Sequence, residues 1–498
     1  MLSFLFDIKV LYFITSIILA TFLSLIFYWK NNNSVHPNHA VIKEQTLGEK
    51  YATPPFVKTG YIETLNAISS NLFPSYLLQW QKELGNTFQV NLIHERHHPM
   101  IVVTGDIDLC RELLNDKGLF KTALYDVYKL VHDEGDDLFT SEGAYWKHSR
   151  KSISPAFSSN HVKRMNDVVV TETEQFKKKL DVFALKGESF DVGKEMIRLT
   201  LNVITQASFQ YDLSTEEAEI FNHELEIVLK EISMGWIPFR WQFGVFIPAV
   251  RRARQAGRTL LSFAMKILNS YREHNSPLKG TVIDLIANNA QYKSDKERAS
   301  DILILLVAGH DTTAYTLAWT LLELGRNPVE QLKLQQDLKL YPLKDRNNSP
   351  ILNHVIKESM RLRTVAPLGS PREICRDIII RKNETNKLER DLFIPKDSLV
   401  LCTQILLNHN TNYHSDPFEF KPSRWANPTT LANVSLIPFS LGRRNCIGQS
   451  LAKAEIVNVL SRLCVDYTFS VESEGSVDLI MTHQPVEARL NVSKSVCS

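Results

Sequence analysis

The sequence lacks an excess of charge of either sign. It contains 57 lysines and arginines against 55 aspartates and glutamates in 498 residues, a net charge of +2. Proteins that bind nucleic acid usually carry a basic stripe, so this balance argues against that class. After the first fifty residues the chain also lacks Gly/Ser-rich or Pro-rich linkers, low-complexity stretches and internal repeats. These absences favour one large domain, for which a hydrophobic fraction of 44% provides enough core.

The sequence also lacks paired cysteines and phosphate-binding loops. Its six cysteines contain no CxxC pair, which is typical of free thiols in a reducing compartment and not of a disulfide scaffold. No P-loop and no GxGxxG loop occurs, so flavin and nicotinamide sites are not evident. Electrons for a redox reaction would then come from another protein.

One long uncharged run lies at the N-terminus, from Val10 to Trp29. A helix of this length spans ~30 Å, the thickness of a bilayer core. A cleaved signal peptide and a buried first helix are the alternatives. The run lacks the small-residue cleavage site of the first and the polar face of the second. We therefore predict a single-pass membrane anchor in residues 1–30, followed by a tether in residues 31–55.

The residues around this run bear on location. The first arginine is Arg96, which argues against an arginine-rich mitochondrial presequence. Lys9 precedes the run, and Lys30 and Lys43 follow it. This weak asymmetry favours a cytoplasmic side for the rest of the chain.

Hydrophobic periodicity predicts a mainly helical chain with small sheets near each end. Alternating residues at 88–92 and an apolar run at 100–103 indicate a hairpin, and strand-like runs recur at 378–381, 399–401 and 477–492. Between residues 105 and 335 helical spacing dominates. The strongest helix runs from Asp301 to Leu324, with Ser300 as its N-cap, and it is apolar enough to cross the core.

A cysteine-containing loop near the C-terminus is the most informative feature. The segment FSLGRRNCIG fits the pattern Phe439-x-x-Gly442-x-Arg444-x-Cys446-x-Gly448. Glycine lets the backbone approach a flat cofactor, arginine offers a fork to a carboxylate and favours an ionised sulfur, and the thiolate suits an iron. The alternative is a buried cysteine in a glycine-rich turn. The segment resembles the haem-binding loop of cytochrome P450 enzymes.

A second motif lies inside the long helix. Residues 308–313 read AGHDTT, and ionisable or hydroxyl side chains are costly in an apolar core helix. The run is similar to the oxygen-activating segment of the same family. The resemblance implies that Asp311 relays protons, that Thr312 places its hydroxyl beside oxygen, and that Ala308 and Gly309 leave space over the haem. The alternative is that these polar groups are satisfied within the core.

Four further residues resemble the family's binding sites for the haem propionates. Trp146 and Arg150 are four residues apart, so they share one face of a helix. The resemblance implies that this pair, Arg372 and Arg444 hold the propionates, with the arginines forming bidentate contacts. The alternative for Arg150 and Arg372 is an ordinary solvated basic residue.

The resemblance also implies a buried network. Glu358 and Arg361 are three residues apart on a predicted helix, 351–362, and Arg424 follows in a Phe-x-Pro-x-Arg segment. The family joins such residues to hold the cysteine loop in register. An ordinary surface ion pair is the alternative.

One short pattern matches a zinc-binding motif, but its context does not support a zinc site. Residues 94–98 read HERHH and match HExxH, a zinc pattern that requires a helix. They fall between two strand-like runs and precede Pro99, so we interpret them as a polar turn.

The resemblance covers residues 50 to 498 and defines the expected fold. It implies a cytochrome P450-type fold, mainly α with small β-sheets, in which a long central helix lies over the haem. Residues 56–498 form the haem-thiolate catalytic domain behind an N-terminal transmembrane helix. The cofactor is haem b, with the Cys446 thiolate as the axial ligand of its iron.

The implied function is a monooxygenase that inserts one oxygen atom of O2 into a lipophilic substrate, such as a fatty acid, sterol or terpenoid. A haem-thiolate isomerase or dehydratase, which acts on a lipid peroxide without external electrons, is the alternative enzyme. A non-catalytic haem-binding membrane protein is a third hypothesis. The implied electron donor is an NADPH-dependent reductase, with cytochrome b5 as a further candidate. The implied location is the endoplasmic reticulum membrane, with a cytosolic catalytic domain.

The family places its substrate contacts in segments that correspond to residues 120–142, 364–370 and 481–484. Their apolar members are Leu130, Val131, Val365, Ala366, Leu368 and Met481. These side chains suit a lipophilic molecule, but they do not identify which one.

Overall fold

The computed structural model describes residues 51–495, except for residues 61–62, 65, 68–70, 91–97, 99, 117–119, 122, 133–134, 236, 238–239, 242, 275–277, 383–389 and 481. The predicted anchor lies outside the described residues, as do most of the tether and of the HExxH pattern. The predictions for these segments stay predictions.

The chain divides into two compact units. The smaller unit holds the residues up to Thr53 together with Ile379–Ile394. Strand β6 (Leu392–Ile394) pairs there with β5 (Ile378–Ile380), and Ala52 forms a parallel bridge to Leu392. The larger unit, Pro54–Ile378 with Pro395–Ser498, holds all the elements described below.

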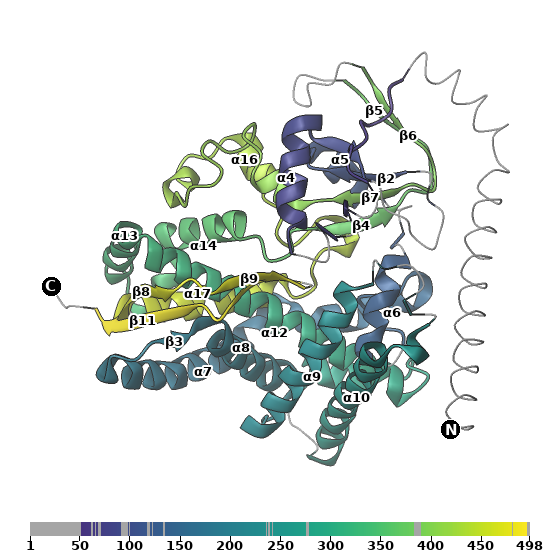
Figure 1. Ribbon diagram of the computed structural model, residues 1–498. Coiled ribbons are helices and arrows are strands. Elements are labelled where there is room, and N and C mark those ends of the chain that lie inside the picture. The colour runs from purple at the N-terminus through teal and green to yellow at the C-terminus, as the bar shows by residue number, and fades with distance from the viewer. Residues whose placement is uncertain are drawn as a thin grey trace, which may run out of the picture. The chain divides into compact units, whose positions relative to one another are not determined.

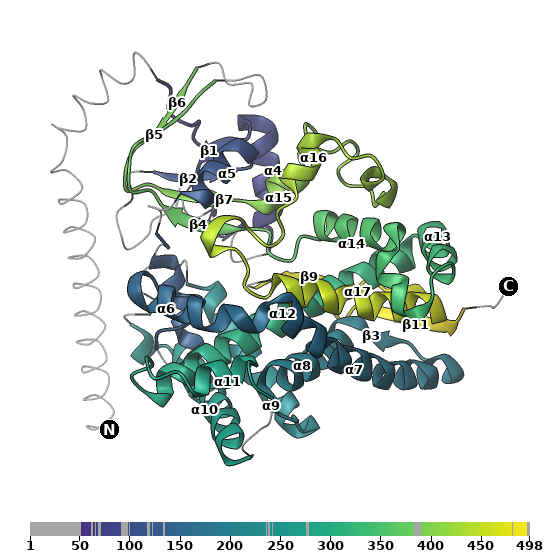
Figure 2. The same cartoon turned by 180° about the vertical axis from the view of Figure 1, so that it is seen from behind.

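The larger unit is mainly helical, as the sequence predicts (Figures 1 and 2). Its α-helices are α4 (Phe73–Leu84), α5 (Ile107–Asn115), α6 (Gly143–Ile153), α7 (Ser159–Lys186), α8 (Val192–Phe209), α9 (Thr215–Ser233), α10 (Pro248–His274), α11 (Val282–Ala287), α12 (Asp295–Arg326), α13 (Pro328–Lys339), α14 (Pro350–Leu362), α15 (Gln404–Asn408), α16 (Thr430–Ser435) and α17 (Gln449–Asp466). Short 3-10 helices are η1 (Ala123–His132), η2 (Ser154–Phe157), η3 (Gly244–Phe246), η4 (Leu343–Asn348), η5 (Pro422–Trp425) and η6 (Gly442–Arg444).

The strands form small sheets. They are β1 (Thr87–Gln89), β2 (Ile101–Thr104), β3 (Phe190–Asp191), β4 (Ser370–Glu373), β7 (Leu399–Cys402), β8 (Tyr467–Ser473), β9 (Ser476–Leu479), β10 (His483–Val486) and β11 (Arg489–Lys494). One sheet has the order β1-β2-β7-β4, with β2 and β7 parallel, and another has the order β3-β11-β8. The predicted hairpin is confirmed, because β1 pairs antiparallel with β2 from Thr87 opposite Thr104. Strands β9 and β10 form a separate hairpin.

Helix α12 begins earlier than the sequence pattern predicts. Its N-cap is Ser294, whose hydroxyl accepts a hydrogen bond from the backbone N–H of Glu297, and not Ser300. Ser300 lies inside the helix and donates its hydroxyl to the carbonyl of Lys296. The first turn contains acidic residues, whose negative charges interact favourably with the positive end of the helix dipole. This turn has no apolar residues at helical spacing. The prediction relied on apolar spacing and therefore began too late.

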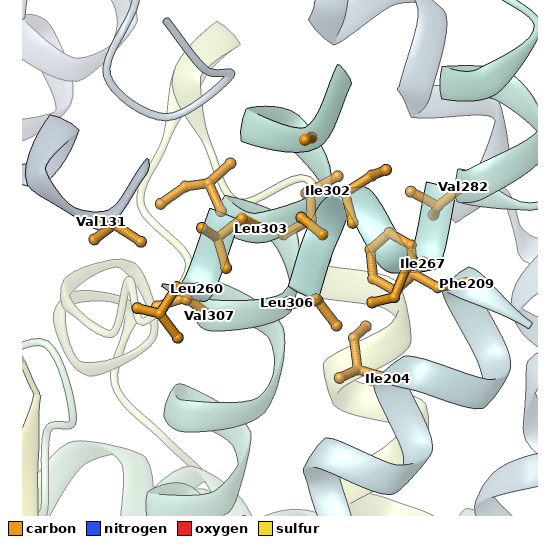
Figure 3. Packing of buried hydrophobic residues seen from close by; sticks show 14 of the residues in the cluster. Val131, Ile204, Phe209, Leu260, Ile267, Val282, Ile302, Leu303, Leu306 and Val307 are labelled. Atoms are coloured by element: carbon orange, nitrogen blue, oxygen red, sulfur yellow. The ribbon is translucent and has the colours of Figure 1, made fainter. Parts of the chain in front are cut away.

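The predicted course of α12 through the core is confirmed. Figure 3 shows Ile302, Leu303, Leu306 and Val307 of α12 packed with apolar side chains of α8 and α10. The second half of α12 belongs to another apolar cluster, which it shares with α14 and α17. Within the described part of the chain, α12 alone is long and apolar enough to cross a membrane, and its most apolar window is 78% buried inside the fold. Burial on all sides explains its nearly unbroken apolar sequence.

Candidate active site

A cavity of about 360 Å³ is lined by α12 and by the loop that precedes α17. Helix α12 contributes Ala308 and Thr312, and the loop contributes Phe439, Cys446 and Gly448. The cavity falls in the size range of cofactor and ligand pockets. The two strongest sequence motifs therefore meet in one place.

Left-handed backbone shapes the cysteine loop. Ser440 and Gly442 have φ angles of 59° and 70°, and the backbone N–H of Cys446 closes the loop on the carbonyl of Phe439 at 2.9 Å. A Cβ on Gly442 would lie 2.1 Å from the carbonyl oxygen of Leu114 in α5. Glycine is required here, but the backbone that it approaches is α5 and not a cofactor.

The Cys446 sulfur lines the cavity. Cys446 is exposed to this cavity, and loss of solvation by the surrounding protein raises the pKa of its thiol. The backbone N–H groups at the start of α17 and the positive charge of Arg150 act in the opposite direction. The sequence motif suggests Arg444 as the cation that favours the thiolate. The structure places Arg150 in that position.

Arg444 instead turns toward α6 and the residues before it. Its Nη1 donates to the carbonyl of Ser141 at 3.1 Å and its Nη2 to the Glu142 carboxylate, and its guanidinium lies 3.6 Å from the centre of the Trp146 ring. Burial lowers the pKa of Arg444 to about 10, and the positive charges of Arg372 and Arg443 lower it as well. The negative charge and hydrogen bond of Glu142 act in the opposite direction. Trp146 therefore orients this guanidinium by stacking.

Two more cations share this part of the cavity lining. Arg372 donates to the Tyr125 hydroxyl at 3.2 Å, and Lys121 lies 4.2 Å from the centre of the Tyr125 ring. Burial, followed by repulsion from Arg372 and Arg444, lowers the pKa of Lys121 well below its usual value. Arg372 is buried, and Arg444 and Lys121 are half-buried. Basic groups that repel one another suit a ligand with more than one carboxylate, as haem has.

Arg150 makes different contacts from its neighbour Trp146. Its two terminal nitrogens donate to the backbone and side-chain oxygens of Asn445 at 2.9 and 2.8 Å. Both Trp146 and Arg150 line the cavity, as their shared helix face predicts. Arg150 thereby ties α6 to the residue next to Cys446.

The polar residues of α12 divide into two groups. Thr312 lines the cavity, and its hydroxyl donates to the carbonyl of Ala308 at 2.9 Å. Asp311 does not line the cavity; it is buried, and its Oδ2 accepts a hydrogen bond of 2.7 Å from the Thr482 hydroxyl. Burial raises the pKa of Asp311 to about 6, although the bond from Thr482 lowers it. Thr482 does line the cavity, and it connects Asp311 to that space.

Gly309 lines the cavity together with Ala308, and it also has a packing role. A Cβ at this position would lie 3.0 Å from Cδ1 of Ile204 in α8. The missing side chain therefore lets α8 and α12 pack closely. Ile204 lines the cavity beside Gly309.

The buried network around Glu358 is present in the structure. Arg361 donates to both Glu358 oxygens at 3.0 and 2.9 Å, and Arg424 donates to Oε1 at 2.8 Å. Trp425 adds a hydrogen bond of 2.9 Å to Oε2. Arg361 also donates to three backbone carbonyls between residues 408 and 419. The network fixes α14 to the chain that leads toward the cysteine loop.

The substrate segments are only partly as predicted. Val365 and Ala366 line the cavity, but Leu130 and Val131 pack in the core cluster with α10 and α12. Leu368 packs against another cluster, next to the β1-β2-β7-β4 sheet. Met481 lies outside the described residues.

Several residues of the site have no individual role in the sequence-based predictions, although four of them fall in the segments 120–142 and 481–484 that are predicted to hold substrate contacts. They are Lys121, Tyr125, Glu142, Asn445 and Thr482. Glu142, Asn445 and Thr482 bond residues far away in the chain, so no local motif joins them to their partners. The i, i+3 spacing of Tyr125 and Tyr128 on η1, which both line the cavity, is the one local signal among them.

Comparisons with known proteins agree with this geometry. A sequence-family model described as "Cytochrome P450" matches residues 54–495. "Protein LUTEIN DEFICIENT 5, chloroplastic" of Arabidopsis thaliana is 26% identical over 79% of this chain and 70% of its own length. "Cytochrome P450 4F8" of Homo sapiens is 26% identical over 71% of this chain and 73% of its own length.

Solved structures show the same fold. The "Crystal structure of a Cytochrome P450 (CYP102L1)" matches with a TM-score of 0.73 at 20% identity, and covers 90% of this chain and 100% of its own. The "Crystal structure of cytochrome P450DA heme domain" matches with a TM-score of 0.73 at 19% identity, over 89% of this chain and 98% of its own. Since the family match spans nearly the whole chain, this protein belongs to the cytochrome P450 family of haem-thiolate monooxygenases.

Proposed function

We propose that this enzyme hydroxylates a lipophilic substrate, with Cys446 as the iron ligand and with Asp311 and Thr312 as the route for protons. One observation carries the proposal. The Thr312 hydroxyl and the Cys446 sulfur line the same cavity, and the Asp311 carboxyl lies directly behind that cavity, bonded to Thr482. An acid and an alcohol are thus available where oxygen is reduced.

The residues present fit haem. Cys446 would supply one thiolate, and Arg372 and Arg444 would supply the cations for two carboxylates. Bound haem supplies the activation of O2 and the transfer of one oxygen atom, while the protein provides orientation and electrostatics. Arg150 holds the backbone beside the thiolate through Asn445, and Trp146 orients Arg444.

The proton route follows from the environment of Asp311. Its pKa of about 6 lies close to neutral pH, so the carboxyl both gains and loses a proton under working conditions. The Thr312 hydroxyl lies one residue further along α12 and faces the cavity. Asp311 would therefore exchange the proton, and the Thr312 hydroxyl would hold it at the wall of the cavity.

Replacing Thr312 with alanine should uncouple the enzyme. Without the hydroxyl, no proton is held at the cavity, and oxygen leaves in a partly reduced form as hydrogen peroxide. Folding and the Soret spectrum should stay intact. Product per NADPH should fall by about tenfold or more, which is less than the full rate enhancement that a positioned proton donor provides. The measurement compares NADPH consumed with product and hydrogen peroxide formed. Unchanged coupling would exclude this role, and loss of haem would make Thr312 structural.

Two neighbouring variants complete this test. Asp311→Asn should slow turnover, because the route loses its ionisable member. Thr313→Ala removes a hydroxyl that also lines the cavity and that donates to the carbonyl of Gly309 at 3.0 Å. It should remain better coupled than Thr312→Ala.

The cavity lining supports a lipophilic substrate. It includes Phe157, Phe209, Leu305 and Val365 as well as aromatic rings of η1. The relatives carry unlike names, among them a "Trifunctional (S)-stylopine synthase/(S)-nandinine synthase/(S)-canadine synthase" of Argemone mexicana, so they do not select one substrate. A binding-spectrum screen of fatty acids, sterols and terpenoids, followed by product analysis, tests the proposal. Oxidation confined to small polar metabolites would contradict it.

The need for electrons separates this function from its alternative. A monooxygenase requires an external donor, for which we propose an NADPH-dependent reductase, with cytochrome b5 as a second donor. An isomerase or dehydratase would instead convert a lipid peroxide with no donor present. The Asp311 and Thr312 pair favours the monooxygenase, since rearrangement of a peroxide needs no protons from solvent.

We also propose that residues 1–30 anchor the catalytic domain, residues 56–498, to the endoplasmic reticulum membrane on its cytosolic side. The uncharged run from Val10 to Trp29 supports this location. Fusing residues 1–40 to a fluorescent protein should direct that protein to membranes. A fusion that stays in the soluble fraction would contradict the anchor.

A further inference from the structure

The turn of the β9–β10 hairpin reaches the acid of α12. The Thr482 hydroxyl donates to Oδ2 of Asp311 at 2.7 Å, across 171 positions of sequence. Thr482 is 3% exposed and Asp311 is 4% exposed, so water competes little for this bond. The same Thr482 lines the cavity, whereas Asp311 does not.

The hairpin is fixed on both sides of this contact. The Trp319 indole of α12 donates to the carbonyl of His483 at 2.8 Å, and the two rings stack with centres 5.2 Å apart. The backbone N–H of His483 donates to the carbonyl of Val365 at 2.8 Å. On the other strand, Asn71 bonds both the backbone of Leu479 and the side chain of Asp478. The position of the Thr482 backbone is therefore set by its neighbours and not by the bond to Asp311.

We propose that Thr482 is a positioning residue for Asp311: it holds the carboxyl in one orientation and links the wall of the substrate cavity to the proton route. This inference rests on the proposed role of Asp311. Thr482 lines the cavity and also donates the hydrogen bond to Asp311. A substrate that contacts the hairpin therefore contacts the residue that orients the Asp311 carboxyl. Oriented acids transfer protons more efficiently than free ones.

The charges around Asp311 are consistent with this role. Burial raises its pKa and the Thr482 hydroxyl lowers it, because the bond stabilises the ionised form. His483 is neutral at pH 7, since burial and the charge of Arg363 lower its pKa to about 4. The other titratable groups that face this region are Tyr315 on α12, Asp191 before α8, Glu226 on α9 and Asp478 on β9. Burial, followed by the charges of Asp311 and these acids, raises the pKa of Tyr315, so the phenol stays protonated.

The test uses Thr482→Val, which keeps the shape and removes the hydroxyl, and Thr482→Ser, which restores it. The protonated-carboxyl infrared band of the holoenzyme is titrated, and the contribution of Asp311 is isolated by subtracting the Asp311→Asn spectrum. This subtraction is needed because burial also raises the pKa of Asp301 to about 7. The midpoint for Asp311 should rise by about one pH unit in Thr482→Val and return in Thr482→Ser.

A matched control removes another hydroxyl from the cavity wall. Thr316 lies on α12 and donates to the carbonyl of Thr312 at 2.8 Å, without a bond to Asp311. Thr316→Val should leave the Asp311 midpoint where it is. A midpoint that fails to rise in Thr482→Val, or that rises equally in Thr316→Val, overturns the proposal.

Turnover separates this inference from the proposed function. Turnover should fall about threefold in Thr482→Val and recover in Thr482→Ser, a smaller loss than in Asp311→Asn because the acid is still present. If Asp311→Asn leaves turnover and coupling unchanged, the role of Asp311 itself fails. If Asp311→Asn is impaired but Thr482→Val keeps the turnover of the unmodified enzyme, only the positioning role fails.

Discussion

Replacing Cys446 with alanine will leave a protein without the red-shifted Soret band of the reduced carbonyl complex. The band reports a thiolate on the iron, and Cys446 is the cysteine whose sulfur lines the cavity between α12 and the loop before α17. The start of α17 directs backbone N–H groups at this sulfur, and Arg150 adds a positive charge. Alanine removes the ligand and keeps the left-handed backbone at Ser440 and Gly442 that shapes the loop.

The control for this variant is another cysteine of the same chain. Cys375 is a half-buried free thiol that does not line the cavity. Cys375→Ala should give the same spectrum as the unmodified enzyme. If the red-shifted band persists in Cys446→Ala, Cys446 is not the ligand, and the assignment of the whole cavity fails with it.

The cysteine loop and the Glu358–Arg361 pair could be predicted because their residues are close in sequence, whereas Arg424 lies 66 positions from Glu358 and was assigned to the network only through the family resemblance. Within ten residues the loop contains its ligand and its glycine turn, and Glu358 and Arg361 are one helical turn apart. Helical spacing likewise placed Trp146 and Arg150 on one face. In each case a local pattern fixes the geometry, so no knowledge of distant contacts is needed.

Contacts between distant segments could not be predicted in the same way. Arg150 binds Asn445, and Asp311 binds Thr482, only because the folded chain brings α6 to the loop and the β9–β10 hairpin to α12. Neither partner carries a local signal. The Leu130 error has a similar cause, since apolar character marks a core residue and a cavity wall equally well.

The second large effect concerns Glu358, which we expect to be needed for stability and not for chemistry. Glu358→Gln keeps the shape of the side chain but leaves the buried guanidinium of Arg361 and that of Arg424 without a counter-charge. Breaking a buried ion pair by removing one partner costs about 3–5 kcal/mol. The urea midpoint of the holoenzyme, followed by its Soret absorbance, should therefore fall markedly.

The pair Glu330 and Lys333 offers a matched control. These residues are also three apart on a helix, and their charged atoms are 2.7 Å apart, but the lysine is largely exposed. Exposed pairs contribute about 0–1 kcal/mol, so Glu330→Gln should barely move the urea midpoint. If Glu358→Gln is no more harmful than Glu330→Gln, the network does not stabilise the fold.

The effect of Glu358→Gln should also depend on pH. Burial alone would raise the pKa of Glu358, but the hydrogen bonds and charge of Arg361 outweigh it, and the pKa lies below its usual value. A carboxyl with a lowered pKa stabilises the folded state above the pKa of the unfolded chain and loses this contribution as the pH falls through the folded pKa. The stability gap between the unmodified enzyme and Glu358→Gln should therefore be full at pH 7 and narrow in acid. A gap that stays constant from pH 7 down to the acid limit of the fold would show that the loss comes from altered packing and not from the charge of Glu358.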